Sequence, residues 1–184
     1  MAPVLRRPII PTPPWTFEFI VQKTPEHVCG FELTRKPEVQ AAYDEHCKRM
    51  LETYESTKDY ILVRLMGYTG FSTQGPHGSH KMKCLNADNL EARWVLLKNE
   101  YPYDLDDGIE HYVFWTTEQA VDLNMVDSKV KENFPDVSRN NLWWLVNEPR
   151  LMSMPCVFHA HIFVRSETKQ VGRFNSFVDT LLYI

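Results

Sequence analysis

Histidines on two short alternating runs are the residues with the clearest chemical potential in this chain. The run His-Ala-His-Ile-Phe-Val-Arg that begins at His159 predicts a β-strand with His159, His161 and Phe163 on one face. A second run, Ile-Glu-His-Tyr-Val-Phe-Trp from Ile109, has the same character and carries His111 near its start. If the two strands lie side by side, the three imidazoles come close together.

Three neighbouring imidazoles could hold a metal ion or carry out acid–base chemistry. A zinc site needs three or four nitrogen, sulfur or oxygen ligands near one point, and His111, His159 and His161 could supply three. Histidine-triad nucleotide hydrolases need a third alternate histidine, and Phe163 stands at that position. No serine-hydrolase elbow or glycine-rich phosphate loop is present. We therefore favour structural or partner-contact histidines over a catalytic metal site, and expect no cofactor.

The composition is that of a single globular domain. The chain has 184 residues, of which 43% are hydrophobic. Its net charge of -4 excludes the strongly basic class of nucleic-acid-binding domains, so any phosphate contact must come from a local patch. The four cysteines form no C-x-x-C pair, which argues against a disulfide framework or a zinc knuckle. We expect a cytoplasmic protein without a membrane partner, because there is no apolar run of ~20 residues and no signal-peptide core.

The elements that position the histidines follow in a simple order. We expect one or two short helices within 15–31 and further helices over 37–56, 127–134 and 171–182. The expected strands are 109–116, 141–146 and 157–165. Residues 58–68 suit either a helix or a buried strand. The order predicts an α+β fold, with a single domain over 15–184 in which N-terminal helices pack on a small, mostly antiparallel sheet and a C-terminal helix closes the fold.

Two segments carry positive charge and no acidic residue. Prolines keep residues 1–14 extended as an arm that contains Arg6 and Arg7. The glycine-rich residues 70–83 predict a long, irregular basic loop. Both segments could be loosely ordered surface chain, or they could contact RNA phosphates, which glycine lets main-chain amides approach. The candidate RNA-binding residues are Arg6, Arg7, Gln74, His77, His80, Lys81 and Lys83.

Two longer stretches resemble one protein family. The first begins Leu-Lys-Asn-Glu-Tyr-Pro-Tyr at Leu97 and continues through the strand after Gly108, and the second ends at Arg165. They resemble the domain of unknown function DUF3605, whose fungal members are called N-acetylglucosamine-induced proteins, and residues 15–68 are similar to it in outline. Asp104 departs from the pattern, because the family usually has glycine there. The residues that carry the motif are Asn99, Pro102, Tyr103, Gly108, His111, Trp115, Trp144, Asn147, His159, His161 and Arg165.

The resemblance implies a binding function. The chain is also similar to the ribosome dormancy factors of microsporidia, which occupy the emptied tRNA sites of inactive ribosomes. This implies a non-enzymatic protein whose partners are rRNA and ribosomal proteins near the tRNA sites, and we expect a monomer without a DNA partner. Two alternatives stay open. One is a metal-dependent hydrolase of a small phosphorylated or sugar substrate that uses His111, His159 and His161, and the other is a scaffold for a protein partner.

Overall fold

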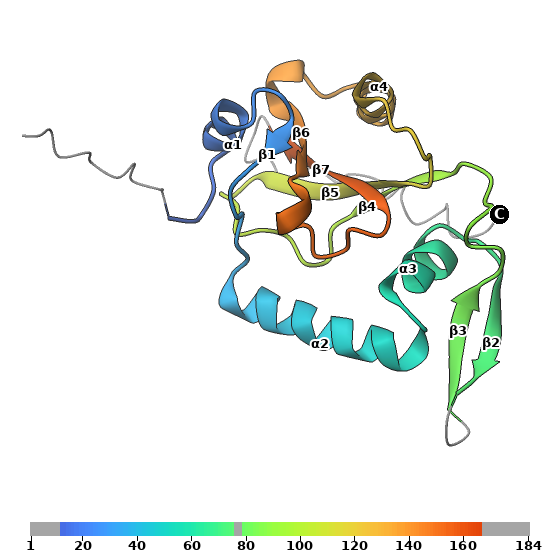
Figure 1. Cartoon of the computed structure of the whole chain (residues 1–184). Coiled ribbons are helices and arrows are strands. Elements are labelled where there is room, and N and C mark those ends of the chain that lie inside the picture. The colour runs from blue at the N-terminus through green and yellow to red at the C-terminus, as the bar shows by residue number, and fades with distance from the viewer. Residues whose placement is uncertain (1–11, 76–78, 167–184) are drawn as a thin grey trace, which may run out of the picture.

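A five-stranded sheet forms the middle of the molecule (Figure 1). The computed structural model describes residues 12–75 and 79–166 of the chain. The strands lie in the order β1-β6-β7-β5-β4, and every neighbouring pair is antiparallel except β1 with β6. Their bounds are Val28–Cys29 (β1), Trp94–Lys98 (β4), Ile109–Thr116 (β5), Leu142–Asn147 (β6) and Phe158–Arg165 (β7). The predicted α+β class and the mostly antiparallel sheet are confirmed.

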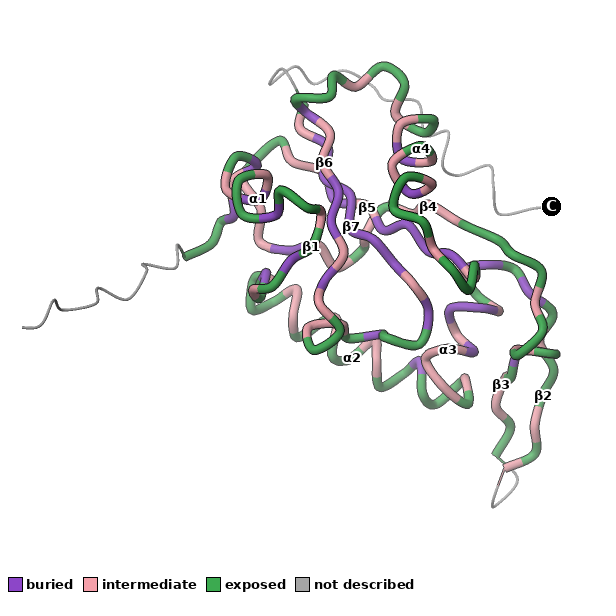
Figure 2. Tube along the Cα trace, turned by 45° about the horizontal axis from the view of Figure 1, so that its top comes forward, coloured by how far each residue is buried: buried purple, intermediate pink, exposed green. Residues whose placement is uncertain are grey.

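Helices cover both faces of this sheet. The described chain contains α1 (Phe17–Lys23), α2 (Pro37–Thr53), α3 (Thr57–Tyr60), a π-helical turn η1 (Ile61–Leu65), α4 (Leu123–Asn133) and the 3₁₀ turns η3 (Arg139–Asn141) and η4 (Pro149–Leu151). Val126 of α4 shares a core cluster with Phe114, whereas Leu62 of η1 shares one with Val113. Because consecutive strand residues point to opposite faces, these clusters lie on opposite sides of β5. Figure 2 shows the buried residues concentrated along β5, β6 and β7.

The central strands bring the histidines together as the alternation predicts. Six of the eight residues of β7 are buried, since β7 lies between two strands and is covered on both faces. In the pairing of β5 with β7, Val113 lies opposite His161 and Trp115 lies opposite His159. His111 is two residues before Val113 and therefore shares that face.

The prediction of an irregular loop over residues 70–83 is wrong, because the segment forms a β-hairpin. Strand β2 (Gly70–Gln74) pairs antiparallel with β3 (His80–Cys84), and Gly75 donates its N–H to the Ser79 carbonyl at 2.6 Å. The glycines and serines lower the intrinsic strand preference, but a complete ladder of cross-strand pairs overrides it.

The hairpin is attached to the end of α2 and projects away from the sheet (Figure 1). Tyr54 forms a parallel bridge with Met82, and the N–H of Glu55 donates to the Met82 carbonyl at 3.0 Å. The Thr73 hydroxyl closes the ladder by donating to the Lys81 carbonyl at 3.0 Å. The contacts of Met82 hold the middle of β3 against the end of α2, and the Thr73 bond joins the two strands of the hairpin.

Other elements differ from their predicted extents. The first helical region contains one helix and the short strand β1, and residues 58–68 adopt the helical alternative. The helix predicted over 171–182 and residues 1–11 of the arm lie outside the described residues. Within the described ranges, no helix combines the length and apolar character needed to cross a membrane.

Candidate functional site

Four buried polar side chains meet on the face of β5 and β7 that carries the histidines. We call Tyr103, His111, Asn147 and His161 the polar cluster, and each is less than 10% exposed, at 7%, 2%, 8% and 6% respectively. His111 lies on β5, His161 on β7 and Asn147 at the end of β6, while Tyr103 comes from the loop between β4 and β5. Four separate segments thus contribute one side chain each.

The hydrogen bonds of the polar cluster form a closed ring. The Tyr103 backbone N–H donates to Nδ1 of His111 at 3.3 Å. Since Nδ1 accepts, we assign the ring proton to Nε2 of His111, which donates to Nδ1 of His161 at 3.0 Å. The remaining proton of His161 is then on Nε2, 3.2 Å from the Tyr103 hydroxyl oxygen. The chain of donors starts and ends at Tyr103.

Two asparagines complete this arrangement. The Asn147 amide donates to the Tyr103 hydroxyl oxygen at 3.0 Å and lies 3.2 Å from Nε2 of His161. Asn99, just after β4, has its amide nitrogen 3.3 Å from Nδ1 of His111, and its side-chain oxygen accepts from the Tyr101 N–H at 2.9 Å. The following Pro102 is half-buried in the same turn. The family-motif residues of this loop therefore shape the turn that places the Tyr103 side chain in the polar cluster.

Burial keeps the cluster uncharged. Desolvation, and secondarily the nearby Arg35 guanidinium, lower the pKa of His111 to about 3. Burial also holds the pKa of His161 well below its usual value, with repulsion from His111 adding to the effect. Burial raises the pKa of Tyr103 to about 12, partly offset by its hydrogen bond with Asn147. At neutral pH the cluster contains two neutral imidazoles and a neutral phenol.

His159 stands beside the cluster without joining its hydrogen bonds. Its Nδ1 lies 3.1 Å from the Val157 carbonyl, so Nδ1 is the protonated nitrogen, and its ring contacts Trp115 with centroids 4.6 Å apart. Nε2 of His111 faces Nδ1 of His161, whereas Nδ1 of His159 faces the Val157 carbonyl. Across residues 12–75 and 79–166, no group of three or more His, Cys, Asp or Glu side chains is arranged to hold a metal ion. The geometry does not favour the metal-centre alternative.

The remaining family-motif residues tie elements together. Gly108 has a positive φ of 85°, which an L side chain adopts with strain, at the turn into β5. The Trp144 indole donates to the Asp127 carboxylate on α4 at 3.3 Å. Arg165, at the end of β7, pairs with Glu18 of α1, and its guanidinium lies 4.7 Å from the centre of the Phe17 ring. These contacts are structural.

Arg35 closes the outer side of the polar cluster, and sequence reasoning missed it. Its guanidinium lies 4.2 Å from the centre of the Tyr43 ring and 5.3 Å from that of Tyr103. Its Nε donates to the Tyr101 carbonyl at 2.9 Å. Arg35 lies in an irregular segment before α2, where no periodic pattern marks it.

The candidate RNA-binding residues that the structure describes all lie on the hairpin. The side chains of Lys81 and Lys83 share one face with Phe71, because Lys83 pairs with Phe71 and alternate residues point the same way. Gln74 and His80 face each other near the tip, on the other side. Arg6, Arg7 and His77 lie outside the described residues.

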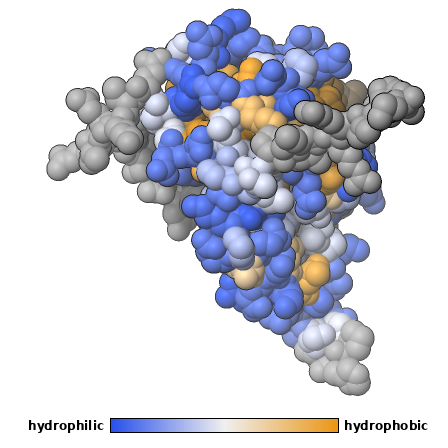
Figure 3. Space-filling model, turned by 90° about the vertical axis from the view of Figure 1, so that its left-hand side faces the viewer, coloured by the Kyte–Doolittle hydropathy of each residue, from blue (hydrophilic) through white to orange (hydrophobic). Residues whose placement is uncertain are grey.

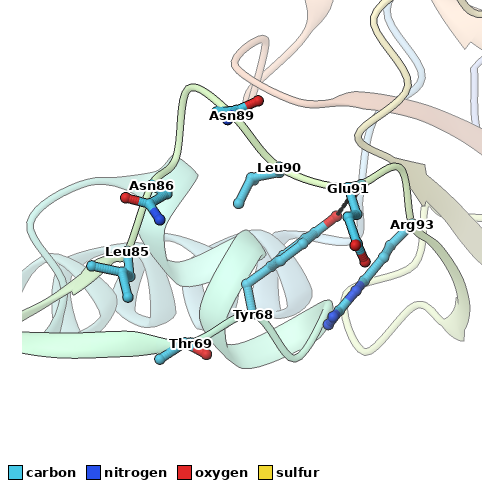
Figure 4. Close-up of a pocket in the computed structure, with 8 residues that line it drawn as sticks. All are labelled: Tyr68, Thr69, Leu85, Asn86, Asn89, Leu90, Glu91 and Arg93. Atoms are coloured by element: carbon cyan, nitrogen blue, oxygen red, sulfur yellow. Dashed lines mark hydrogen bonds between the residues drawn. The ribbon is translucent and has the colours of Figure 1, made fainter.

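The surface carries small apolar patches (Figure 3) and two cavities among the described residues. In the view of Figure 3 the surface is mostly hydrophilic, with small apolar patches between polar side chains. A cavity of about 190 Å³ lies beside Tyr68, whose hydroxyl bonds to the Glu91 carbonyl and whose ring is covered by Arg93 at 4.4 Å (Figure 4). A second cavity of about 300 Å³ lies near Lys58 and Cys156. Neither cavity contains a residue of the polar cluster or the hairpin strands.

Comparison with known proteins identifies relatives across most of the chain. The family DUF3605, described as a protein of unknown function, matches residues 27–165. An uncharacterized protein of Saccharomyces cerevisiae, YPL067C, is 26% identical over 168 residues, which cover 82% of this chain and 80% of the yeast protein. The crystal structure of HTC1 is similar with a TM-score of 0.51 and 22% identity, covering 83% of this chain and 85% of that one. The likeness to HTC1 concerns the fold alone. The family match includes the polar cluster and the hairpin.

Proposed function

We propose a function for this chain, which belongs to the DUF3605 family of proteins of unknown function: it is a non-enzymatic, ribosome-binding dormancy factor. In this proposal it occupies the tRNA sites of inactive ribosomes, and its hairpin and proline-rich arm contact rRNA. The observation that carries the proposal is the β2–β3 hairpin, which projects from the body (Figure 1) and contains lysines and histidines but no acidic residue.

The charge distribution supports a contact made by the hairpin. The chain as a whole carries a net charge of -4, so its overall field does not attract phosphate. On the hairpin, Lys83 is exposed and lies opposite Phe71, which is 44% exposed. A cation next to an exposed ring offers both kinds of contact that RNA accepts, namely phosphate pairing and base stacking.

The buried histidines support a role that does not depend on catalysis. The ring nitrogens of His111 and His161 form hydrogen bonds within the polar cluster, and the two residues are only 2% and 6% exposed. A general base must reach the proton that it abstracts, and these rings offer no path to a bound substrate. Their hydrogen bonds link β5, β6 and β7 of the central sheet.

Co-sedimentation with vacant ribosomes at low and high salt tests the proposal. The parent chain is expected to sediment with the particle at low salt and to be partly released at high salt, because phosphate contacts release counterions. Lys83→Gln should weaken sedimentation. Lys23→Gln, which removes an exposed cation from the last turn of α1, is the matched control and should behave as the parent does.

Two results would overturn the proposal. One is the absence of sedimentation with the whole particle and with either subunit. The other is equal binding to vacant ribosomes and to ribosomes whose tRNA sites are filled, because a dormancy factor that occupies those sites must compete with tRNA. Purified subunits and tRNA-loaded particles therefore belong in the same experiment.

A further inference from the structure

The face of α2 that meets the body is lined by aromatic rings. Tyr43 and His46 of α2, together with Tyr54 just after it, lie against Tyr60 of α3 and Tyr101 of the loop after β4. We call these five residues the ring row. All five are half-buried, and in this 17-residue helix Met50 is the one residue that is fully buried. The ring row therefore remains partly open to solvent.

The rings form a continuous sequence of contacts. The centroids of Tyr43 and Tyr101 are 5.6 Å apart, and those of Tyr101 and His46 are 5.1 Å apart. His46 is 5.4 Å from Tyr60, which is 5.3 Å from Tyr54. These spacings are typical of interacting aromatic pairs, and they extend the row along α2 to its C-terminal end.

Arginines surround the ring row. Arg35 lies over the Tyr43 ring at one end of the row. Burial raises the pKa of Tyr101 and that of Tyr60, and the charges of Arg49 and Arg64 partly offset the two increases, respectively. Within the described part of the chain, none of these arginines forms a salt bridge.

One carboxylate opposes them. Glu100 raises the pKa of both Tyr60 and Tyr101, although burial is the larger cause of each increase. Among the charged groups that act on the pKa values of Tyr43, Tyr60 and Tyr101, arginines thus outnumber carboxylates. A cation beside an aromatic ring is the arrangement that can pair with a phosphate next to a stacked base.

The ring row leads into the basic hairpin. Tyr54, its last member, bridges to Met82 on β3. The Lys81 ammonium reaches back and donates to the Leu51 carbonyl on α2 at 2.6 Å. Rings and cations therefore follow one another from Arg35 to the hairpin, which is the pattern of surfaces that track a single strand of nucleic acid.

We propose that the ring row binds unpaired nucleotides of single-stranded RNA, with bases stacked against Tyr101 and His46 and phosphates paired with Arg35, Arg49 and Arg64. The inference deepens the proposed ribosome-binding function and rests on it for the identity of the partner as RNA. Stacking on aromatic rings is tolerant of sequence, because every base has a π-face. The ring row accordingly contributes affinity for exposed rRNA bases and little sequence preference.

Binding of a fluorescent, unstructured oligoadenylate RNA by the full chain tests the inference. Tyr101→Ala is expected to weaken binding at least about fivefold, because each stacked base contributes ~1–3 kcal/mol. Tyr101→Phe keeps the ring and should bind as the parent does. Trp94→Ala removes a ring that is 39% exposed on β4, outside the row, and is the matched control. His46→Ala provides a second test should Tyr101→Ala fail to fold, which thermal unfolding reveals.

The outcomes separate this inference from the proposed function. If the parent sediments with vacant ribosomes while Tyr101→Ala and His46→Ala bind RNA and ribosomes equally well, the ring-row inference fails and the proposed function stands. If the parent does not sediment with ribosomes but binds oligoadenylate through Tyr101, the proposed function fails and the RNA surface stands. Tyr101-dependent binding of an oligoglutamate peptide, without binding of RNA, would overturn the inference in favour of an acidic protein partner.

Discussion

At the scale of single residues, Tyr103 makes hydrogen bonds with three other members of the polar cluster. Its N–H donates to His111, and its hydroxyl oxygen accepts from His161 and Asn147. Because a buried polar atom without a partner is destabilising, each member of the cluster requires the others. This explains why motif residues that are distant in sequence occur together in one chain.

Replacement of the Tyr103 hydroxyl tests this interdependence. Tyr103→Phe keeps the ring but leaves Nε2 of His161 and the Asn147 amide without their shared acceptor, so we expect the free energy of unfolding to fall by about 1–3 kcal/mol. Urea denaturation measures the change. Tyr112→Phe is the control, because that half-buried hydroxyl donates to the partly exposed Glu110 carboxylate on the opposite face of β5, and its loss should be smaller. Equal losses in the two variants would contradict the role assigned to the cluster.

The buried histidines also set a dependence of stability on pH. Burial lowers the pKa of His111 from 6.5 to about 3, so below pH 6.5 the unfolded chain binds a proton that the folded chain does not. Stability is therefore fully present above pH 6.5 and is lost progressively as the pH falls towards 3. For His111 this should remove about 2 kcal/mol between about pH 7 and pH 5. The free energy of unfolding, measured with urea at several pH values, should fall less steeply with decreasing pH in His111→Asn. An unchanged slope would refute the assignment.

At the scale of elements, Asp59 connects α3 to the hairpin. One oxygen of this carboxylate, which is 6% exposed, accepts from the Cys84 N–H at 2.8 Å. The other oxygen accepts from the Ser56 hydroxyl at 2.5 Å, while the Ser56 side chain caps α3 by accepting from the Asp59 N–H. A single side chain thus orients both the start of a helix and the end of β3.

Loss of this carboxylate should therefore affect function as well as stability. Asp59→Ala leaves the buried Cys84 N–H without an acceptor and is expected to reduce the free energy of unfolding by about 1–3 kcal/mol. It should also weaken sedimentation with vacant ribosomes under conditions where the variant is folded, because the hairpin loses its fixed base. Asp122→Ala removes the N-cap of α4, away from the hairpin, and should lower stability while leaving ribosome binding intact. Intact binding by Asp59→Ala would show that the orientation of the hairpin does not matter.

At the scale of the whole molecule, charge is distributed unevenly. The chain has 24 acidic residues against 20 lysines and arginines, yet residues 70–84 contain cations and no acid. A protein of this kind gains little from its overall field when it approaches RNA, and its affinity depends on a small number of local phosphate contacts.

The salt dependence of RNA binding should report the number of those contacts. Each cation that pairs with a phosphate contributes about 0.7–0.9 to the slope of the logarithm of affinity against the logarithm of salt concentration. Lys83→Gln should therefore reduce the slope by about one contact, whereas Lys23→Gln should leave it unchanged. Titrations of ribosomes or oligoadenylate over a range of salt concentrations measure the slope. An identical slope for the parent and Lys83→Gln would show that Lys83 makes no phosphate contact.

The sequence by itself determined the central strands and the face on which the histidines lie. Side chains alternate with a period of two, so the runs at His111 and His159 could be assigned to strands and to a common face from local information. The closeness of His111 to His161 followed from placing the strands side by side. The helix from Pro37 was predictable for the same local reason, from its apolar spacing and its N-terminal proline.

The tertiary structure decided what those histidines do and what shape the basic segment takes. Tyr103 and Asn147 meet His161 across separations of 58 and 14 residues, and Arg35 reaches Tyr101 across 66, which no periodic pattern encodes. Residues 70–83 read locally as a loop because glycine and serine disfavour strands. They form a hairpin because pairing between the two arms supplies the hydrogen bonds that each arm lacks alone. Local spacing fixes the direction of a side chain, whereas its partners depend on the register and on segments that only folding brings together.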